Sequence, residues 1–353
     1  MIQLKSELDV LTVKKEKLVE LDYMRFIACF AVMIVHISAT GVTEYIHGSF
    51  PHIVMTLLNR SLKFTTPIFI FLSGITGFYG YRNKEIKYFQ FLKRRLPKVI
   101  IPYLIWCAIY YFAYIKMGFY SFDIKFFAKN VLQGTMSYHL YFVIIIVQLY
   151  IIGPLFYKLV KNSKNRILLL VISAVVTSLC VEYIRFDLAD RIFLKYMFFY
   201  MFGMYVTLEY DKYTSWLKRN SIFAIIGYII AGLAYTLVSY YNMKIYSYVW
   251  FIFSTVSILF VYLVGLNSKD KLQKIYSFIK LFGQSSYYIY LMHPIVLTTM
   301  IVIAADKGIL SVTTKLIIFF AVVIPVTVIS CLLYTMIKNK IKNSVKRKTV
   351  EAK

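Results

Sequence analysis

Long apolar runs recur from one end of this 353-residue chain to the other. A helix needs about 20 apolar residues to cross the roughly 30 Å hydrocarbon core of a bilayer, and the runs have that length. Barrel strands would instead alternate in polarity over about ten residues. The sequence therefore predicts an all-α, polytopic integral membrane protein of the cell membrane. About ten spans are expected, at residues 21–41, 60–80, 97–116, 139–158, 166–184, 192–209, 221–241, 245–266, 283–304 and 312–337.

Basic residues set the expected orientation of these spans. The chain has 41 Lys and Arg against 16 Asp and Glu. They form short clusters between apolar runs and no single stripe, so nucleic acid is not an expected partner. Alternate segments, counted from the N-terminus, hold 29 basic residues, and the intervening segments hold 11. Because cytoplasmic loops are enriched in Lys and Arg, both termini are predicted to be cytoplasmic.

Three regions follow from this arrangement. Residues 1–20 form a basic cytoplasmic segment, either a helix on the inner leaflet or a free tail. Residues 21–337 form the transmembrane domain, and residues 338–353 form a basic cytoplasmic tail. No cysteine pair has the spacing of a zinc site, and no metal site is expected.

The first expected span contains three polar residues, Asp22, Arg25 and His36. At about 100° per residue, Arg25 and His36 point in nearly the same direction and lie about 16 Å apart along the helix axis. Inserting a charged residue at the centre of a transmembrane helix costs about 2.5–3.5 kcal/mol on insertion scales. Polar residues on one side of a span therefore indicate a functional or structural role. Either this column of polar residues is catalytic, or Asp22 and Arg25 form an interfacial pair and His36 an interhelical hydrogen bond.

Polar residues in other spans are further candidates. His293 precedes Pro294 in the ninth expected span, and His139 stands at the outer end of the fourth. Ser73 precedes Gly74 in the second span, where small residues also serve close helix packing. The His-Pro pair is equally explained by a packed kink, and His139 by an aromatic belt at the membrane boundary.

Arg94 and Arg95 begin the third expected span within a basic cluster. Guanidinium groups bind phosphate in a bidentate manner, which suits a phosphorylated cytosolic ligand. The same cluster is also an ordinary topology signal. No phosphate-binding loop or dinucleotide fingerprint is present, which disfavours an energised pump or a redox enzyme.

Five motifs occur in order along the chain: Arg25-x10-His36, Pro67 to Ser73-Gly74, Arg94-Arg95-x-Pro97, His139-Leu-Tyr-Phe, and Gly283 to His293-Pro294. Together they resemble the acyltransferase 3 family of membrane O-acyltransferases, and within it the Gram-positive branch concerned with modification or export of intercellular-adhesion polysaccharide (poly-N-acetylglucosamine). The family usually has Trp where Tyr141 stands.

The resemblance implies acyl transfer, acetyl or alternatively succinyl, from cytosolic acyl-CoA to a hydroxyl of a cell-surface polysaccharide or lipid-linked precursor. No permanently bound cofactor is implied. His36 would be the general base, Arg25 would steer CoA or stabilise negative charge, and Arg94 and Arg95 would bind CoA phosphates. His293, Ser73 and His139 would orient substrate. The alternatives are a polysaccharide exporter, which also needs polar intramembrane residues, and a structural partner of a glycan synthase.

Overall fold

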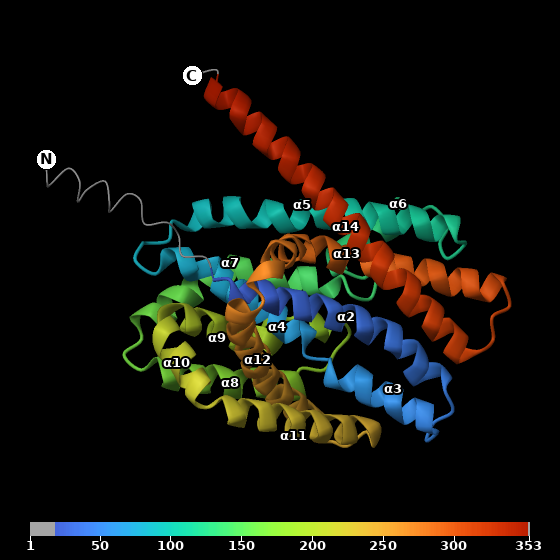
Figure 1. Cartoon of the computed structure of the whole chain (residues 1–353), viewed down its shortest axis with the longest axis horizontal. Coiled ribbons are helices and arrows are strands. Elements are labelled where there is room, and N and C mark those ends of the chain that lie inside the picture. The colour runs from blue at the N-terminus through green and yellow to red at the C-terminus, as the bar shows by residue number, and fades with distance from the viewer. Residues whose placement is uncertain (1–17, 352–353) are drawn as a thin grey trace, which may run out of the picture.

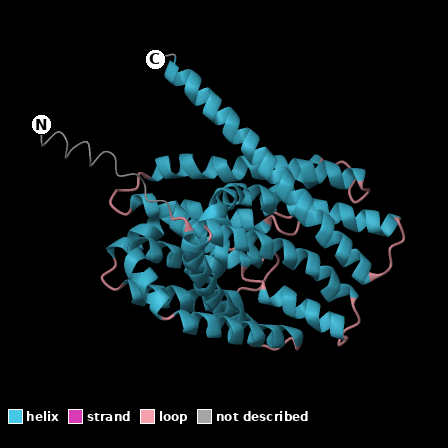
Figure 2. Cartoon of the chain, in the orientation of Figure 1, coloured by secondary structure: helices cyan, strands magenta, loops and turns pink. Residues whose placement is uncertain are grey.

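The computed structural model describes residues 18–351, so most of the basic segment predicted for residues 1–20 lies outside the described residues. Within residues 18–351 the chain forms helices joined by short loops and contains no strand (Figure 2). This confirms the all-α prediction. The helices are α2 (Glu20–Glu44), α3 (Phe50–Ser61), α4 (Thr65–Phe78), α5 (Tyr88–Lys116), α6 (Ile124–Gln133), α7 (Tyr141–Asn162), α8 (Arg166–Tyr183), α9 (Met197–Leu208), α10 (Tyr210–Arg219), α11 (Ser221–Tyr240), α12 (Tyr246–Lys271), α13 (Tyr276–Asp306) and α14 (Val312–Glu351) (Figure 1).

Nine helical segments in this described part are long and apolar enough to span a membrane, as expected of a multi-pass membrane protein. The predicted number of about ten is one too high by this criterion. The span predicted at 192–209 is a shorter apolar helix, Phe193–Leu208. Its rise of about 24 Å falls short of a roughly 30 Å hydrocarbon core.

The second span also differs from its predicted bounds. It begins at Phe50, because Ser49 accepts a hydrogen bond from the backbone N–H of His52 and caps α3 within the expected outer loop. The chain then breaks at residues 62–64 before α4 begins. Together α3 and α4 form one apolar segment, Phe50–Tyr81, with Lys63 at its internal break.

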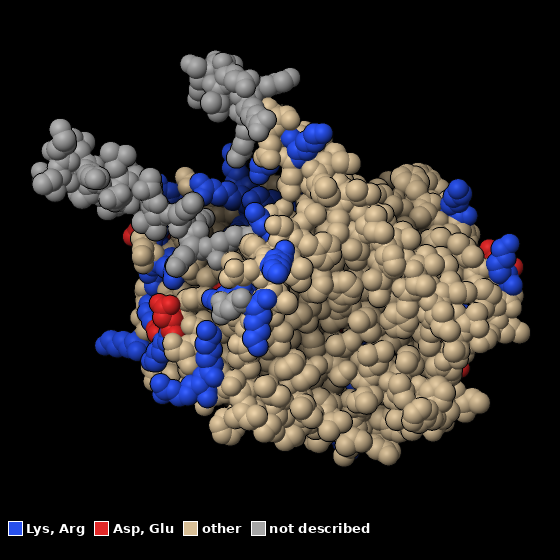
Figure 3. Space-filling model, in the orientation of Figure 1, with Lys and Arg blue, Asp and Glu red and all other residues tan. Residues whose placement is uncertain are grey.

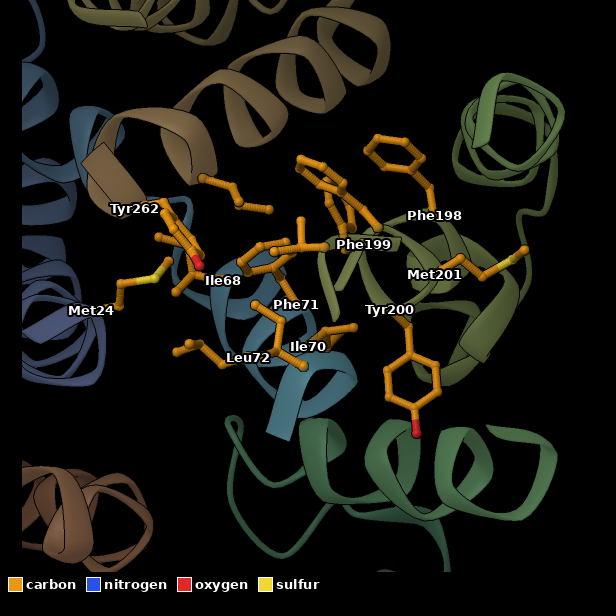
Figure 4. Close-up of a cluster of buried hydrophobic side chains, with 14 of the residues drawn as sticks. Met24, Ile68, Ile70, Phe71, Leu72, Phe198, Phe199, Tyr200, Met201 and Tyr262 are labelled. Carbon is orange, nitrogen blue, oxygen red and sulfur yellow. The ribbon is translucent and has the colours of Figure 1, made fainter. Parts of the chain in front are cut away.

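The centre of the bundle is the contact between α4 and α9. A Cβ atom added at Gly74 of α4 would lie 2.3 Å from the carbonyl oxygen of Tyr200, and one at Gly203 of α9 would lie 2.3 Å from that of Phe71. The two glycines thus let the backbones touch, which confirms the packing interpretation for Gly74. Around this contact, buried side chains of the two helices interdigitate with Met24 of α2 and Tyr262 of α12 (Figure 4).

Charge is distributed unevenly over the surface. Figure 3 shows Lys and Arg mostly toward the end from which α14 leaves the body of the molecule, while the middle of this face is almost free of charge. A wide uncharged belt is what contact with lipid requires. That the basic end faces the cytoplasm remains a prediction from the positive-inside rule.

Candidate functional site

An inner cavity of about 230 Å³ lies among α2, α4, α5, α7 and α13. Two of the predicted residues, Arg25 and Ser73, line it. Lys98 of α5 lines it as well, and Thr76 stands one turn beyond Ser73 on α4. The cavity therefore presents two cationic side chains, and its walls combine apolar side chains with the hydroxyl groups of serine, threonine and tyrosine residues.

A buried carboxylate holds Arg25 in place. The Asp22 and Arg25 side chains form an ion pair of 2.8 Å, and the hydroxyl of Tyr276 donates to the second carboxylate oxygen at 3.1 Å. Gly283 of α13 makes room for this carboxylate, since a Cβ there would lie 3.1 Å from it. The Arg25 side chain is still 22% exposed. Arg25 is thus fixed from one side and open to the cavity on the other.

Ser73 lacks the surroundings of an activated nucleophile. Its hydroxyl donates to the carbonyl of Phe69 at 2.8 Å. Among the described residues that line the inner cavity there is no histidine and no carboxylate. A serine nucleophile needs an adjacent base, so this position suits contact with a ligand better than covalent catalysis.

Arg94 and Arg95 have different environments. Arg95 donates to the carbonyls of Thr76 at 2.6 Å and Gly77 at 3.2 Å, and so satisfies the C-terminal end of α4. Arg94 is exposed on α5, and neither arginine is among the described residues that line the inner cavity. Arg95 therefore supports the cavity wall, whereas Arg94 is free to meet a ligand outside it.

A second, outer cavity of about 160 Å³ is lined by His36 and His139. Lys63, at the break between α3 and α4, also reaches it. Most of the remaining wall carries aromatic rings and hydroxyl groups, contributed by Thr65, Thr66, Tyr138, Tyr141, Tyr196 and Trp250. Tyr141, where the family usually has Trp, bonds with Thr66 through their hydroxyls at 3.1 Å.

Three imidazoles from separate parts of the chain meet beside this cavity. The ring centroid of His293 on α13 lies 5.2 Å from that of His36 on α2 and 5.7 Å from that of His139. The ring of Tyr138 lies 4.8 Å from His36 on another side. The structure thus brings together all three predicted histidines, which the sequence could not place relative to one another.

The hydrogen bond of His293 identifies its tautomer. Its Nδ1 lies 2.9 Å from the carbonyl oxygen of Ile289. A carbonyl can only accept, so Nδ1 carries the proton and Nε2 of the neutral ring carries the lone pair. Nε2 is buried and has no hydrogen-bond partner within the described residues. His293 therefore offers an acceptor beside His36.

His139 lies in a turn and not in the predicted fourth span, because α7 begins only at Tyr141. Gly134, with a φ of 66°, ends α6 and turns the chain toward this position. The hydroxyl of Tyr290 donates to the His139 carbonyl and ties the turn to α13. Burial, followed by the neighbouring His293 and His36, lowers the pKa of His139 well below its usual range. His139 is accordingly a neutral imidazole at neutral pH.

Two aromatic side chains divide the cavities. Phe142 and Tyr290 line both of them, and their rings meet edge to face at 5.3 Å. Arg25 opens to the inner cavity and His36 to the outer one, about 16 Å apart along α2. The expected column is therefore present on one helix, with an aromatic partition between its two ends.

Sequence reasoning missed several residues that line these cavities. Lys63 was detectable as a cation beside an apolar run, and Lys98 as a member of the basic cluster of the third span. Phe142 carried no signal, because a phenylalanine in an apolar run is ordinary. Its role depends on which helix it faces, and that is a property of the tertiary structure.

Residues 18–336 match the family described as an acyltransferase domain. The chain is 24% identical to the probable poly-beta-1,6-N-acetyl-D-glucosamine export protein of Staphylococcus aureus (strain MSSA476), over 80% of this chain and 83% of the relative. It is 26% identical to the protein of the same description from Staphylococcus epidermidis, over 81% and 83%. No solved structure matches the chain.

Proposed function

Because this chain belongs to the acyltransferase 3 family, we propose that it moves an acyl group from cytosolic acyl-CoA to a hydroxyl of a cell-surface polysaccharide or its lipid-linked precursor. Acetyl is the first candidate and succinyl the alternative. The observation that carries the proposal is the position of Arg25 and His36, which open to two cavities on either side of Phe142 and Tyr290. Such an arrangement suits two substrates that reach one helix from opposite ends.

The inner cavity suits the donor. Its cations, Arg25 and Lys98, complement an anionic ligand, and Arg94 lies exposed on the same helix as Lys98 to meet phosphates. The pantetheine arm of CoA is a slender chain that carries the thioester at its end. In the proposal, this arm covers the distance of about 16 Å from Arg25 to His36 and brings the thioester to the imidazole. In this proposal the basic end of the molecule and both termini face the cytoplasm.

The outer cavity suits a sugar acceptor. Aromatic rings with polar tips pack against the apolar faces of a sugar and bond its hydroxyls, and Trp250, Tyr138 and Tyr196 provide them here. The names of the staphylococcal relatives refer to a polymer of N-acetylglucosamine. We extend that substrate class to this chain as the acceptor.

The chemistry then follows from the imidazoles. His36 accepts the proton of the sugar hydroxyl as its oxygen attacks the thioester carbonyl, forming the new C–O bond. The C–S bond breaks, and the imidazolium returns the proton to the departing CoA thiolate. The lone pair on Nε2 of His293 orients the ring of His36 or the acceptor hydroxyl.

The test is acyl transfer by the purified protein in liposomes, with labelled acetyl-CoA and a short N-acetylglucosamine oligomer. His36→Ala should lower turnover about 10²–10⁴-fold, the usual contribution of a general base. His47→Ala is the matched control, because His47 is exposed and lines neither cavity. Equal turnover of the two variants would remove His36 from the mechanism.

Export is the second candidate, favoured by the names of the relatives. It predicts that His36→Ala leaves glycan acylation intact in cells while surface polymer disappears. A purely structural role beside a glycan synthase predicts no phenotype for His36→Ala or Arg25→Ala when the protein inserts normally. Mass spectrometry of surface polysaccharide from a deletion strain distinguishes these outcomes from acyl transfer.

A further inference from the structure

A groove of about 770 Å³ lies between α5 and α14, with α13 as its floor. It is much larger than either cavity of the proposed active site. Figure 1 shows α14, which supplies one wall of the groove, crossing the bundle beside α5 and then leaving it. The proposed acyl transfer gives it no role.

The groove is lined by lysines and by a longer stretch of mostly apolar side chains. Its cationic lining residues are Lys98 of α5 and Lys338 and Lys342 of α14. Trp106 and Ile109 of α5 continue the wall away from the lysines, over a helical rise of about 16 Å. On α14 the wall runs back from the lysines to Cys331 and Ser330, and Met292 of α13 lies between the two helices.

The positive charge of these lysines is not balanced by the wall itself. None of the described residues lining the groove is acidic. Lys338 is held in place, because its ammonium donates to the hydroxyl of Tyr288 at 2.5 Å and lies 5.1 Å from the centre of that ring. Asn339 donates to Gln284 at 2.9 Å and fastens the same part of α14 to α13. Lys338 therefore belongs to an ordered part of the wall, which favours a bound anion there.

We propose that this groove binds one anionic glycerophospholipid from the leaflet at the basic end. The headgroup phosphate lies among Lys98, Lys338 and Lys342, and an acyl chain follows the apolar wall toward Trp106. Cations near a membrane surface attract anionic lipid by about 1 kcal/mol each. A zwitterionic lipid would fill the apolar part equally well, but its headgroup carries a cation beside the phosphate and so would balance the three lysine charges less.

The bound lipid would also border the donor cavity. Lys98 and Tyr287 line both the groove and the inner cavity. The hydroxyl of Tyr287 donates to the carbonyl of Val99 at 2.8 Å and holds α13 against α5 at this wall. A lipid in the groove would cover the membrane-facing side of the wall that Lys98 and Tyr287 form beside the inner cavity. Binding of this lipid does not depend on the proposed reaction.

The test measures lipid retention by the full-length protein, without reference to activity. Protein is purified from nanodiscs containing equal amounts of phosphatidylglycerol and phosphatidylcholine, and bound lipid is read by native mass spectrometry. The wild type should retain phosphatidylglycerol preferentially. The double variant Lys338→Gln/Lys342→Gln should bind it about thirtyfold more weakly, from two lost cations at about 1 kcal/mol each.

The matched control is Lys218→Gln/Lys274→Gln, which removes equal charge from exposed positions that do not line the groove. Equal loss of phosphatidylglycerol in the two double variants would overturn the proposal, as would equal retention of both lipids by the wild type. Free CoA provides a further arm. If it displaces phosphatidylglycerol from the wild type, the groove belongs to the donor and the lipid proposal fails.

Discussion

Replacing Gly74 by alanine should destabilise the protein, whereas the same change at Gly77, one turn along α4, should not. The Cβ atom that Gly74→Ala introduces would lie 2.3 Å from the Tyr200 carbonyl oxygen and 3.2 Å from the Cα of Gly203. Ordinary contacts begin near ~3.5 Å, so α4 and α9 would have to separate by about 1 Å. At Gly77 the added Cβ would have no heavy atom within 4 Å other than those of its chain neighbours and the adjoining backbone of its own helix.

The magnitudes follow from these distances. Overpacking typically costs about 1–3 kcal/mol, and Gly74→Ala should fall at the upper end, because the obstructing atoms are backbone and cannot rotate away. Gly77→Ala should be neutral or stabilising by up to about 1 kcal/mol, since alanine is the better helix former. The two variants should thus differ by about 3 kcal/mol in the free energy of unfolding.

Thermal unfolding in detergent, followed by tryptophan fluorescence, gives the comparison directly. Turnover adds a second measurement, because Ser73 and Thr76 of α4 line the inner cavity. A displacement of about 1 Å there can cost about 10²-fold in rate. Equal unfolding midpoints for the two alanine variants would refute the claim that Gly74 is required for contact between α4 and α9.

Three other substitutions test the site. Ser73→Ala should keep the wild-type kcat, because the Ser73 hydroxyl donates to a backbone carbonyl and no histidine or carboxylate among the described residues lines its cavity; an acyl group trapped on Ser73 would contradict direct transfer. Asp22→Asn should raise the KM for acyl-CoA, because Arg25 loses its ion pair, and an unchanged KM would separate Arg25 from donor binding. Tyr290→Phe should lower stability by about 1–3 kcal/mol, because the carbonyl of His139 loses its donor; an unfolding midpoint equal to that of the wild type would show that this bond contributes nothing.

The apolar runs predicted most of the helices, because length and hydropathy are local properties of a membrane span. The predictions of helix bounds from these runs were wrong where a helix cap or a short apolar run interrupted the pattern. The cap at Ser49 started a helix inside an expected loop, and the run at 192–209 proved shorter than a full span. Neither feature changes mean hydropathy enough to be detected.

The candidate site was predicted residue by residue but not as an arrangement. Helical periodicity related Arg25 to His36, since both lie on α2. It could not show that His139 and His293 would meet His36, because those residues lie on other parts of the chain. The same limit applies to Phe142, whose position between two cavities depends on how α7 packs against α13.

The aromatic partition of Phe142 and Tyr290 also bears on the permeability of the membrane. Water entering the inner cavity and water entering the outer one would meet at these two rings and would not form a continuous file. In the proposed reaction, the two rings would thereby keep protons and small ions from leaking down their gradients during acyl transfer. The proposed enzyme would then join a donor from one side of the bilayer to an acceptor on the other without opening a path for ions.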